Sequence, residues 1–341
     1  MLRLLHRFSL RDLFQLRTVV AIFTCLNLVL CTYLVVTKVN KTFESDKDDS
    51  HGSNGLPLDV PKSKSGIPLV LHQVWTNVNV PVAFSSVMKT WVTNQGSWRK
   101  YFWEWKDVDK LVAATHPEFL EVFRSLPSHQ MRLDIFKYML MYRVGGVYAD
   151  IDMQSLRPMD DVLDAHPCIL PTHQHVVIAH NGVFTASVIL LCRPGHPFFK
   201  KVVDYFIQLD PKLLRTNEDT GEQVFGRLAT EYMNEIGTNP ATGPQDALHF
   251  AQGDEFLPRT LIPRATLLET CMEKLTDDNV PVWIKNACVS LKTRDFNSFL
   301  PPAAYTDHRF AGMFEGDAGT KYNLNITIHV KDVYGKYYVI Y

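Results

Sequence analysis

The feature that most constrains how this chain folds is the stretch Gly145-Gly146-Val147-Tyr148-Ala149-Asp150-Ile151-Asp152. Two glycines end a helical pattern, a short apolar run follows, and two carboxylates come one residue apart. Because side chains on a strand alternate between its faces, Tyr148, Asp150 and Asp152 point to one face and the residues between them point to the other. The stretch therefore predicts a strand with paired carboxylates at its carboxyl end, the edge of an open α/β sheet where ligands bind.

Paired carboxylates at such an edge suit a divalent metal ion. Mg²⁺ and Mn²⁺ prefer hard oxygen ligands and are commonly shared with the phosphate groups of a substrate. A bare Asp-x-Asp is a weak motif, however, because the same residues also end strands at solvated turns. The first hypothesis is a metal-assisted site for a substrate that carries a diphosphate, and the rest of the chain has to support it.

The residues before the two glycines have the length and pattern of a buried helix, at 130–143. Apolar residues form rows on two of its sides, which is typical of a helix that lies in a core. Asp134 and Lys137 interrupt these rows three positions apart, so they lie side by side on one face. They are either an ordinary helical ion pair or two residues that border the pocket of the paired carboxylates.

The first 66 residues have the composition of a membrane anchor followed by a stem. Residues 18–37 form an uncharged run of 20 residues, long enough to cross a hydrocarbon core of about 30 Å. A cleaved signal peptide, the alternative, would have a shorter apolar run and a small-residue cleavage site. The arginines before the run favour a cytosolic amino terminus. We therefore expect a cytosolic tail (1–17), a transmembrane signal anchor (18–37), a flexible stem (38–66) and one luminal domain (67–341).

Charge and missing motifs exclude several classes of function. A formal net charge of -1 gives no electrostatic basis for binding nucleic acid. The chain has no G-x-G-x-x-G after an early strand, no G-x-x-x-x-G-K-[ST] and no G-x-S-x-G. The dinucleotide-binding fold, the P-loop and the serine hydrolase therefore have no local support.

The cysteines and glycosylation motifs agree with a luminal location. The predicted luminal domain contains Cys168, Cys192, Cys271 and Cys288. These four allow three disulfide pairings, of which Cys271 with Cys288 is the most local. Asn40-Lys41-Thr42 and Asn325-Ile326-Thr327 match the acceptor sequence for N-glycosylation.

The luminal domain predicts a succession of strands and helices. Besides the central motif, we expect strands at 69–75, 101–105 and 183–191, helices at 82–92, 197–209 and 222–236, and β-rich pieces at 282–285, 287–292 and 324–330. This pattern suits one large α/β domain. Trp98, Trp103 and Trp105 are either a platform on which a sugar stacks or core packing, and core packing is more common for aromatic residues in strands.

The histidines do not by themselves define a metal site. The cluster at 166–180 contains His166, His173, His175 and His180. Its spacing fits no common zinc pattern, so a solvated loop is the better interpretation. His308 lies in an expected polar turn, and a lone histidine is more often a surface residue than a ligand. The tight turn Thr242-Gly243-Pro244 offers backbone donors that could face an anion.

The segment 129–160 resembles glycosyltransferase family 32, the family of the sugar-binding region with the D-x-D motif. This family includes fungal initiating α-1,6-mannosyltransferases, inositol phosphorylceramide mannosyltransferases and α-1,4-galactosyl- and N-acetylglucosaminyltransferases. Three more segments are similar in the same order. They are Ile67-Pro68 with His72-Gln73-Val74-Trp75, then Ser187 to Phe199, and then Thr242-Gly243-Pro244. The resemblance covers residues 67–244 well and the tail poorly.

The resemblance implies a GT-A fold, a single α/β domain whose mixed, mainly parallel sheet is flanked by helices and binds a nucleotide sugar across its carboxyl edge. It also implies an Mn²⁺ or Mg²⁺ ion that is held at D-x-D and stabilises charge on the leaving nucleoside diphosphate. Asp152 is the residue expected to touch the metal, and Asp150 is expected to reach ribose or sugar hydroxyls.

The residue roles that follow are expectations from the resemblance. The expected catalytic residues are Asp134, Asp150 and Asp152. The expected donor-binding residues are Asp134, Lys137, Tyr148 and Asp150. The expected metal ligands are Asp152, Asp150 and His308.

Two segments depart from the family pattern. Lys137 stands where arginine is usual, and lysine cannot offer arginine's bidentate fork to the donor sugar. His308 is the nearest match to a late family histidine, but Met313 and Phe314 replace the serine and tryptophan that usually follow. Family members retain anomeric configuration, and no catalytic base can be assigned here. The leaving phosphate itself could deprotonate the acceptor hydroxyl.

The sequence thus predicts a type II Golgi membrane glycosyltransferase that moves a hexose to a glycolipid or glycan acceptor. Mannose from GDP-mannose is the favoured donor, and UDP-galactose, UDP-N-acetylglucosamine and UDP-glucose are the rivals. A non-catalytic protein that binds nucleotide sugars or glycans on the same scaffold is the alternative of another class. The presence of Asp134 and both D-x-D carboxylates argues against that alternative.

Overall fold

The computed structural model describes residues 60–337, apart from 173–184, 239–242, 252, 259–261, 281, 294, 297–299 and 310–323. The predicted cytosolic tail, signal anchor and most of the predicted stem therefore lie outside the described residues. Among the helices that are described, none is long and apolar enough to cross a membrane.

A six-stranded sheet organises the fold, with the strand order β3-β1-β4-β7-β6-β8. Its strands are β1 (Val70–Trp75), β3 (Arg99–Glu104), β4 (Gly146–Ala149), β6 (Cys168–Pro171), β7 (Ile189–Cys192) and β8 (His249–Ala251). Neighbouring strands are parallel except where β7 pairs with β4 and with β6. The prediction of a mixed, mainly parallel sheet is confirmed, and β7 is the strand that runs against the other five.

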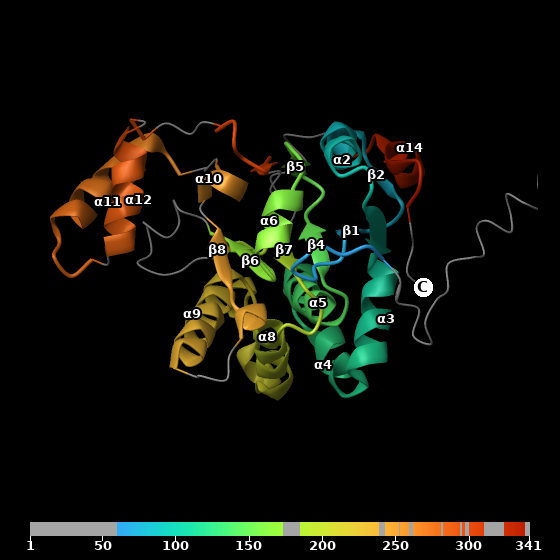
Figure 1. The fold of residues 1–341 in the computed structure, drawn as a ribbon. Helices are drawn as coiled ribbons and strands as arrows, with labels where there is room; N and C mark the ends of the chain where they lie inside the picture. The colour runs from blue at the N-terminus through green and yellow to red at the C-terminus, as the bar shows by residue number, and fades with distance from the viewer. Residues whose placement is uncertain are drawn as a thin grey trace, which may run out of the picture. The chain divides into compact units, whose positions relative to one another are not determined.

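Helices cover both faces of this sheet (Figure 1). One face packs against α3 (Trp105–Thr115), α4 (Leu120–Ser125), α5 (His129–Arg143), α8 (Pro197–Gln208) and α9 (Glu222–Thr238). The other packs against α2 (Val82–Asn94), α6 (Asp160–Ala165), α10 (Gly253–Phe256) and α14 (Val330–Tyr334). The alternation along the strands decides which core a side chain enters. Tyr148 lies in the core beside α5, whereas Val147 and Ala149 lie in the opposite one.

Most predicted elements of the first two thirds form as expected. The strands at 69–75 and 101–105 and the helices at 82–92, 130–143, 197–209 and 222–236 are present, with ends shifted by one or two residues. The strand predicted at 183–191 is shorter, because only Ile189–Cys192 pairs as β7. Trp98 and Trp103 are buried and Trp105 packs against the core, which confirms core packing over a sugar platform.

The two glycines before β4 are required by both conformation and space. Ser128 caps the start of α5 by accepting the Met131 amide hydrogen at 3.1 Å. Gly145 and Gly146 then turn the chain with positive φ angles of 67° and 99°, which side-chain-bearing residues rarely adopt. A Cβ on Gly145 would lie 2.5 Å from the Pro194 nitrogen. The Gly-Gly pair therefore allows the turn between α5 and β4 to pack closely against Pro194.

The prediction for the tail at 282–292 is wrong. These residues form a helix, α12 (Val282–Thr293), which packs against α11 (Arg264–Thr276) around a small core of its own. The buried positions Ile284, Cys288 and Leu291 recur at helical spacing, but short β-prone pieces obscured that period. A disulfide joins Cys271 to Cys288, the pairing favoured as most local. The remaining pair, Cys168 and Cys192, forms a second disulfide.

Two short antiparallel pairs return the tail to the main body. They are β2 (Asn79–Pro81) with β10 (Thr327–His329), and β5 (Met153–Ser155) with β9 (Thr306–His308). The strand expected at 324–330 is therefore present in shorter form as β10. The second pair matters for the site, because β5 begins directly after Asp152.

Candidate active site

The paired carboxylates lie at the carboxyl end of β4. Asp150 directly follows the strand, and its amide donates to the Val188 carbonyl at 2.9 Å. A turn closed by the Met153 amide and the Asp150 carbonyl, at 2.9 Å, then places Asp152 before β5. Ile151 is buried in the core opposite α5. The short strand therefore presents its two carboxylates at the expected edge of the sheet.

Lys137 joins the helix to this edge. Its Nζ lies 3.7 Å from Oδ1 of Asp134 and 3.5 Å from Oδ1 of Asp150, and its side chain is 1% exposed. The ammonium also lies 4.9 Å from the centre of the Tyr148 ring, a favourable cation–π distance. The Tyr148 hydroxyl donates to Asp150 Oδ1 at 2.5 Å. Four of the predicted site residues therefore share one contact network, and the helical ion pair lies beside the first D-x-D carboxylate.

Asp134 is the most deeply buried carboxylate of this network. Gln130 Nε2 donates to its Oδ1 at 2.9 Å, and Thr220 Oγ1 donates to its Oδ2 at 3.2 Å. Burial raises the pKa of Asp134 to about 7, and the Lys137 charge only partly opposes this. Burial likewise raises the pKa of Asp150, with Lys137 opposing it and the Asp152 charge adding to it. A cation near these carboxylates would relieve their repulsion.

Asp152 faces a different partner, His308. Pairing of β5 with β9 places Met153 opposite His308, and His308 Nε2 lies 3.3 Å from Asp152 Oδ2. The expectation that His308 lies in a polar turn is therefore wrong, because it ends a strand and its side chain is 13% exposed. Burial by itself would lower the pKa of His308, but the hydrogen bond and charge of Asp152 raise it above its ordinary value. The long-range strand pair thus brings imidazole nitrogen to the carboxylate expected to hold a metal.

The donor set at this edge fits a divalent ion in chemistry. Carboxylate oxygen suits Mn²⁺ and Mg²⁺, and imidazole nitrogen is a ligand of several divalent transition metals; Asp152 with His308 supplies both. Asp150, Asp152 and His308 do not converge as one tight group in this structure, since Asp150 turns towards Lys137 and Tyr148. Asp152 and His308 are therefore the residues that would hold the ion.

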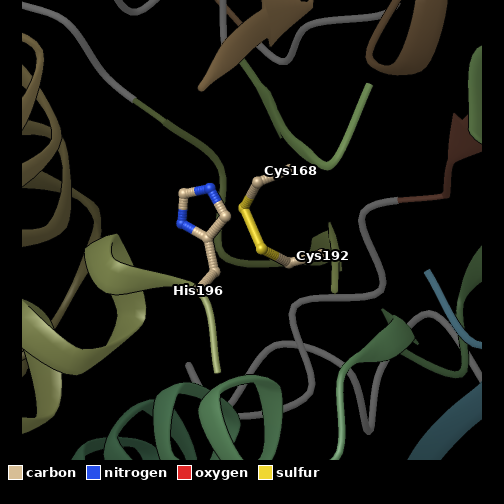
Figure 2. A group of neighbouring side chains, drawn as sticks. All are labelled: Cys168, Cys192 and His196. Atoms are coloured by element: carbon tan, nitrogen blue, oxygen red, sulfur yellow. A yellow bond between two sulfur atoms is a disulfide. The ribbon is translucent and has the colours of Figure 1, made fainter. Parts of the chain in front are cut away.

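Within the described part of the chain, Cys168, Cys192 and His196 are the residues whose possible metal ligands all lie within 4.8 Å of one another (Figure 2). The two sulfurs are bonded to each other across the β6–β7 pair. His196 caps α8, and its Nδ1 accepts the Phe198 amide hydrogen at 3.3 Å. Burial lowers the pKa of His196 to about 4, so the ring is neutral and carries its proton on Nε2. The bonded sulfurs and the protonated Nε2 of His196 are therefore not free to bind a metal. The disulfide is a structural cross-link.

Several residues that support the site were not predicted. Gln73 in β1 donates to the Asp150 carbonyl at 3.3 Å and accepts the Tyr334 hydroxyl hydrogen. His72 Nε2 donates to the Gly145 carbonyl at 3.0 Å, and burial lowers its pKa to about 4, which keeps it neutral. Both belong to the His-Gln-Val-Trp segment that resembles the family. The resemblance marks these two residues but assigns them no role in the site. Thr220 lies in no recognised motif.

The structure describes two other candidates only in part. His173, His175, His180 and Thr242 lie outside the described residues. Gly243 leads into a 3-10 turn whose Asp246 pairs with Arg193 at 2.8 Å. Arg193 follows the end of β7 that lies beside Gly146, at the opposite edge of the sheet from Asp150.

A known protein family matches the part of the chain that holds most of this site. Residues 70–169 match the family described as "Glycosyltransferase sugar-binding region containing DXD motif". This range includes Asp134, Lys137, Asp150 and Asp152 and leaves out His308.

Curated relatives are similar at low identity. "Inositol phosphoceramide mannosyltransferase 1" of Schizosaccharomyces pombe is 26% identical over 174 residues, which cover 50% of this chain and 51% of that protein. "Initiation-specific alpha-1,6-mannosyltransferase" of Candida albicans is 23% identical over 232 residues, which cover 57% and 60%. The chain thus spans about half the length of the first of these relatives. A solved structure titled "PaToxG Glycosyltransferase" is 13% identical, with a TM-score of 0.36 over 80% of this chain and 98% of that one.

Proposed function

We propose that this chain, whose residues 70–169 match the sugar-binding region of the DXD-motif glycosyltransferases, is a metal-dependent retaining glycosyltransferase with a GT-A type α/β domain. One observation carries the proposal. A buried network of Asp134, Lys137 and Asp150 meets the Asp152–His308 pair at the carboxyl edge of β4. Such an edge is where α/β sheets bind ligands.

The two halves of the site suit the two halves of a nucleotide sugar. Asp152 and His308 would hold the divalent ion, which neutralises charge on the nucleoside diphosphate as it leaves. Asp134 and Asp150 accept hydrogen bonds from sugar hydroxyls, and Lys137 fixes the direction of both carboxylates. Tyr148 orients Asp150, because its ring is buried and its hydroxyl donates to that carboxylate.

The favoured donor is GDP-mannose, and the favoured acceptor is a glycolipid or a glycan. Support comes from the relatives, several of which are named as mannosyltransferases, including inositol phosphoceramide mannosyltransferases. A UDP-hexose is the rival donor. Lys137 stands where arginine is usual in the family pattern, and its single ammonium already contacts two carboxylates.

We place the protein in the Golgi membrane, with residues 18–37 as the anchor and the catalytic domain in the lumen. The proposal rests on the uncharged run in the sequence. The two disulfides support it, because such bonds persist in oxidising compartments.

A thermal-shift panel tests the proposal. The purified protein is mixed with GDP, UDP and their hexoses, each with and without Mn²⁺, and positive donors are then assayed for transfer. We expect metal-dependent stabilisation by one nucleotide and its sugar, lost in Asp152→Ala. Stabilisation without any transfer or hydrolysis would favour the non-catalytic binding protein. No metal-dependent stabilisation by any nucleotide would overturn the proposed function.

A further inference from the structure

The segment before α9 reaches the site from a part of the chain that the family match does not include. It begins with a 3-10 turn, Asn217–Asp219, and continues into α9 at Glu222. The Thr220 hydroxyl donates to Asp134 at 3.2 Å, and the Thr220 carbonyl accepts the Tyr138 hydroxyl hydrogen at 3.0 Å. Both contacts are buried. The segment is therefore fixed against α5 at the level of Asp134.

Glu222 is carried to the D-x-D edge by this anchoring. Its Oε1 accepts the Ser187 amide hydrogen at 3.1 Å. The next residue, Val188, accepts the Asp150 amide hydrogen at 2.9 Å. Because β7 runs against its neighbours, its beginning lies at the carboxyl edge of β4. The Ser187 amide, which binds Glu222, and the Val188 carbonyl, which binds the Asp150 amide, thus belong to adjacent residues.

Electrostatic contacts agree with this placement. Burial raises the pKa of Tyr138, and the charges of Asp134 and Glu222 add to the effect. Glu222 also contributes, after Asp152 and Asp150, to raising the pKa of His308 against the lowering caused by burial. The Glu222 carboxylate therefore affects the pKa values of both Tyr138 and His308.

The carboxylates at this edge now number four, Asp134, Asp150, Asp152 and Glu222, and Lys137 contacts two of them. Carboxylates accept hydrogen bonds from hydroxyl groups. A carboxylate or sulfate on the bound sugar would instead meet like charges, which are costly at short range in a partly buried site. Such a pocket favours a neutral, hydroxyl-rich sugar.

We propose that Glu222 is a specificity-determining residue, which binds hydroxyl groups of the transferred sugar together with Asp134 and Asp150 and makes the pocket reject acidic sugars. The proposal rests on the proposed function, because it assumes that a nucleotide sugar binds at this edge. It adds a residue outside the D-x-D region and the discrimination that this residue makes between neutral hexoses and uronic acids.

Binding measurements on three variants of the full chain test it. They are Glu222→Gln, Glu222→Ala and the control Glu218→Gln, whose side chain is exposed on the neighbouring turn. The probes are the nucleotide hexose that the wild type binds best, the uronic acid with the same base, and the free nucleoside diphosphate, all with Mn²⁺. Comparison of the three probes separates sugar contacts from nucleotide contacts.

We expect the wild type to bind the neutral sugar at least about tenfold more tightly than the uronic acid. Glu222→Gln should narrow that ratio about tenfold, with the affinity for the free nucleoside diphosphate and the melting temperature unchanged. Glu222→Ala should weaken binding of the neutral sugar, and Glu218→Gln should match the wild type. A general structural role would weaken all three probes together.

The outcomes distinguish this inference from the proposed function. A wild type that binds no nucleotide sugar with Mn²⁺ overturns both. A wild type that binds one, with a Glu222→Gln protein of unchanged sugar discrimination, overturns only the role of Glu222. The role also fails if Glu222→Gln loses affinity for the free nucleoside diphosphate.

Discussion

Asp150 and Asp152 are one residue apart, yet two different parts of the chain hold them. Asp150 lies in a network of Lys137 and Tyr148, which belong to α5 and β4, the helix and strand joined at Gly145. Asp152 faces His308, which β9 brings from more than 150 residues further along the chain. The first half of the site depends on local packing, and the second depends on a strand pair that only the folded tail provides.

This difference predicts different consequences of damage. A loss in the Asp150 half leaves buried charges without partners and should reduce stability. A loss in the Asp152 half leaves the fold intact and should reduce metal binding. Four substitutions, taken from the largest expected effect to the smallest, test the comparison.

Asp152→Ala should have the largest effect. It removes the carboxylate that would hold the ion, and we expect a fall of about 10³-fold in kcat/KM with little change in melting temperature. Steady-state transfer assays with Mn²⁺ measure it. Asp160→Ala, on the exposed first turn of α6, is the control. Retained turnover in the Asp152 variant would exclude this residue from the metal site.

Lys137→Met should be the most destabilising change in the Asp150 half. It leaves the buried Asp134 and the half-buried Asp150 without their cation, and breaking a buried pair costs about 3 kcal/mol or more of the free energy of unfolding. Denaturant unfolding measures it. Lys110→Met is a matched control, because Lys110 pairs with Asp107 at the same i,i+3 spacing but is 46% exposed. Equal losses in the two variants would contradict the importance of burial.

His308→Ala should lower the affinity for the metal and leave the stability of the core unchanged. Loss of one ligand or of its orienting partner typically costs about 10- to 100-fold in metal affinity. Titration of Mn²⁺ in the presence of the nucleoside diphosphate measures this effect. His329→Ala, at the end of β10, should leave the Mn²⁺ affinity unchanged. An unchanged Mn²⁺ affinity in the His308 variant would show that His308 is not part of the metal site.

Asp134→Asn should change the pH dependence of stability. The pKa of Asp134 is raised from 3.8 to about 7 by burial. Between these values the folded protein binds more protons than the unfolded chain, so this carboxyl makes stability fall as pH rises from about 4 to about 7. The variant should lose that component. Unfolding curves at several pH values check it, and parallel pH profiles for the two proteins would contradict it.

The expected elements that failed show where local sequence misleads. Residues 282–292 contain β-prone side chains, yet they form a helix because Ile284, Cys288 and Leu291 have to face α11. His308 was expected in a turn, and its pairing with Met153 makes it the end of a strand. In both cases the deciding partner is distant in the sequence, so tertiary packing overrode local preference.

The sequence alone determined the local half of this protein's site. The glycine pair fixes a close helix–strand connection, the alternation of β4 sends Asp150 and Tyr148 towards α5, and helical spacing puts Asp134 and Lys137 together. These are short-range consequences of backbone geometry. Only the tertiary structure brought His308 to Asp152 and Thr220 and Glu222 to the same edge, because strand pairing and helix packing join residues whose separation in the chain carries no periodic signal.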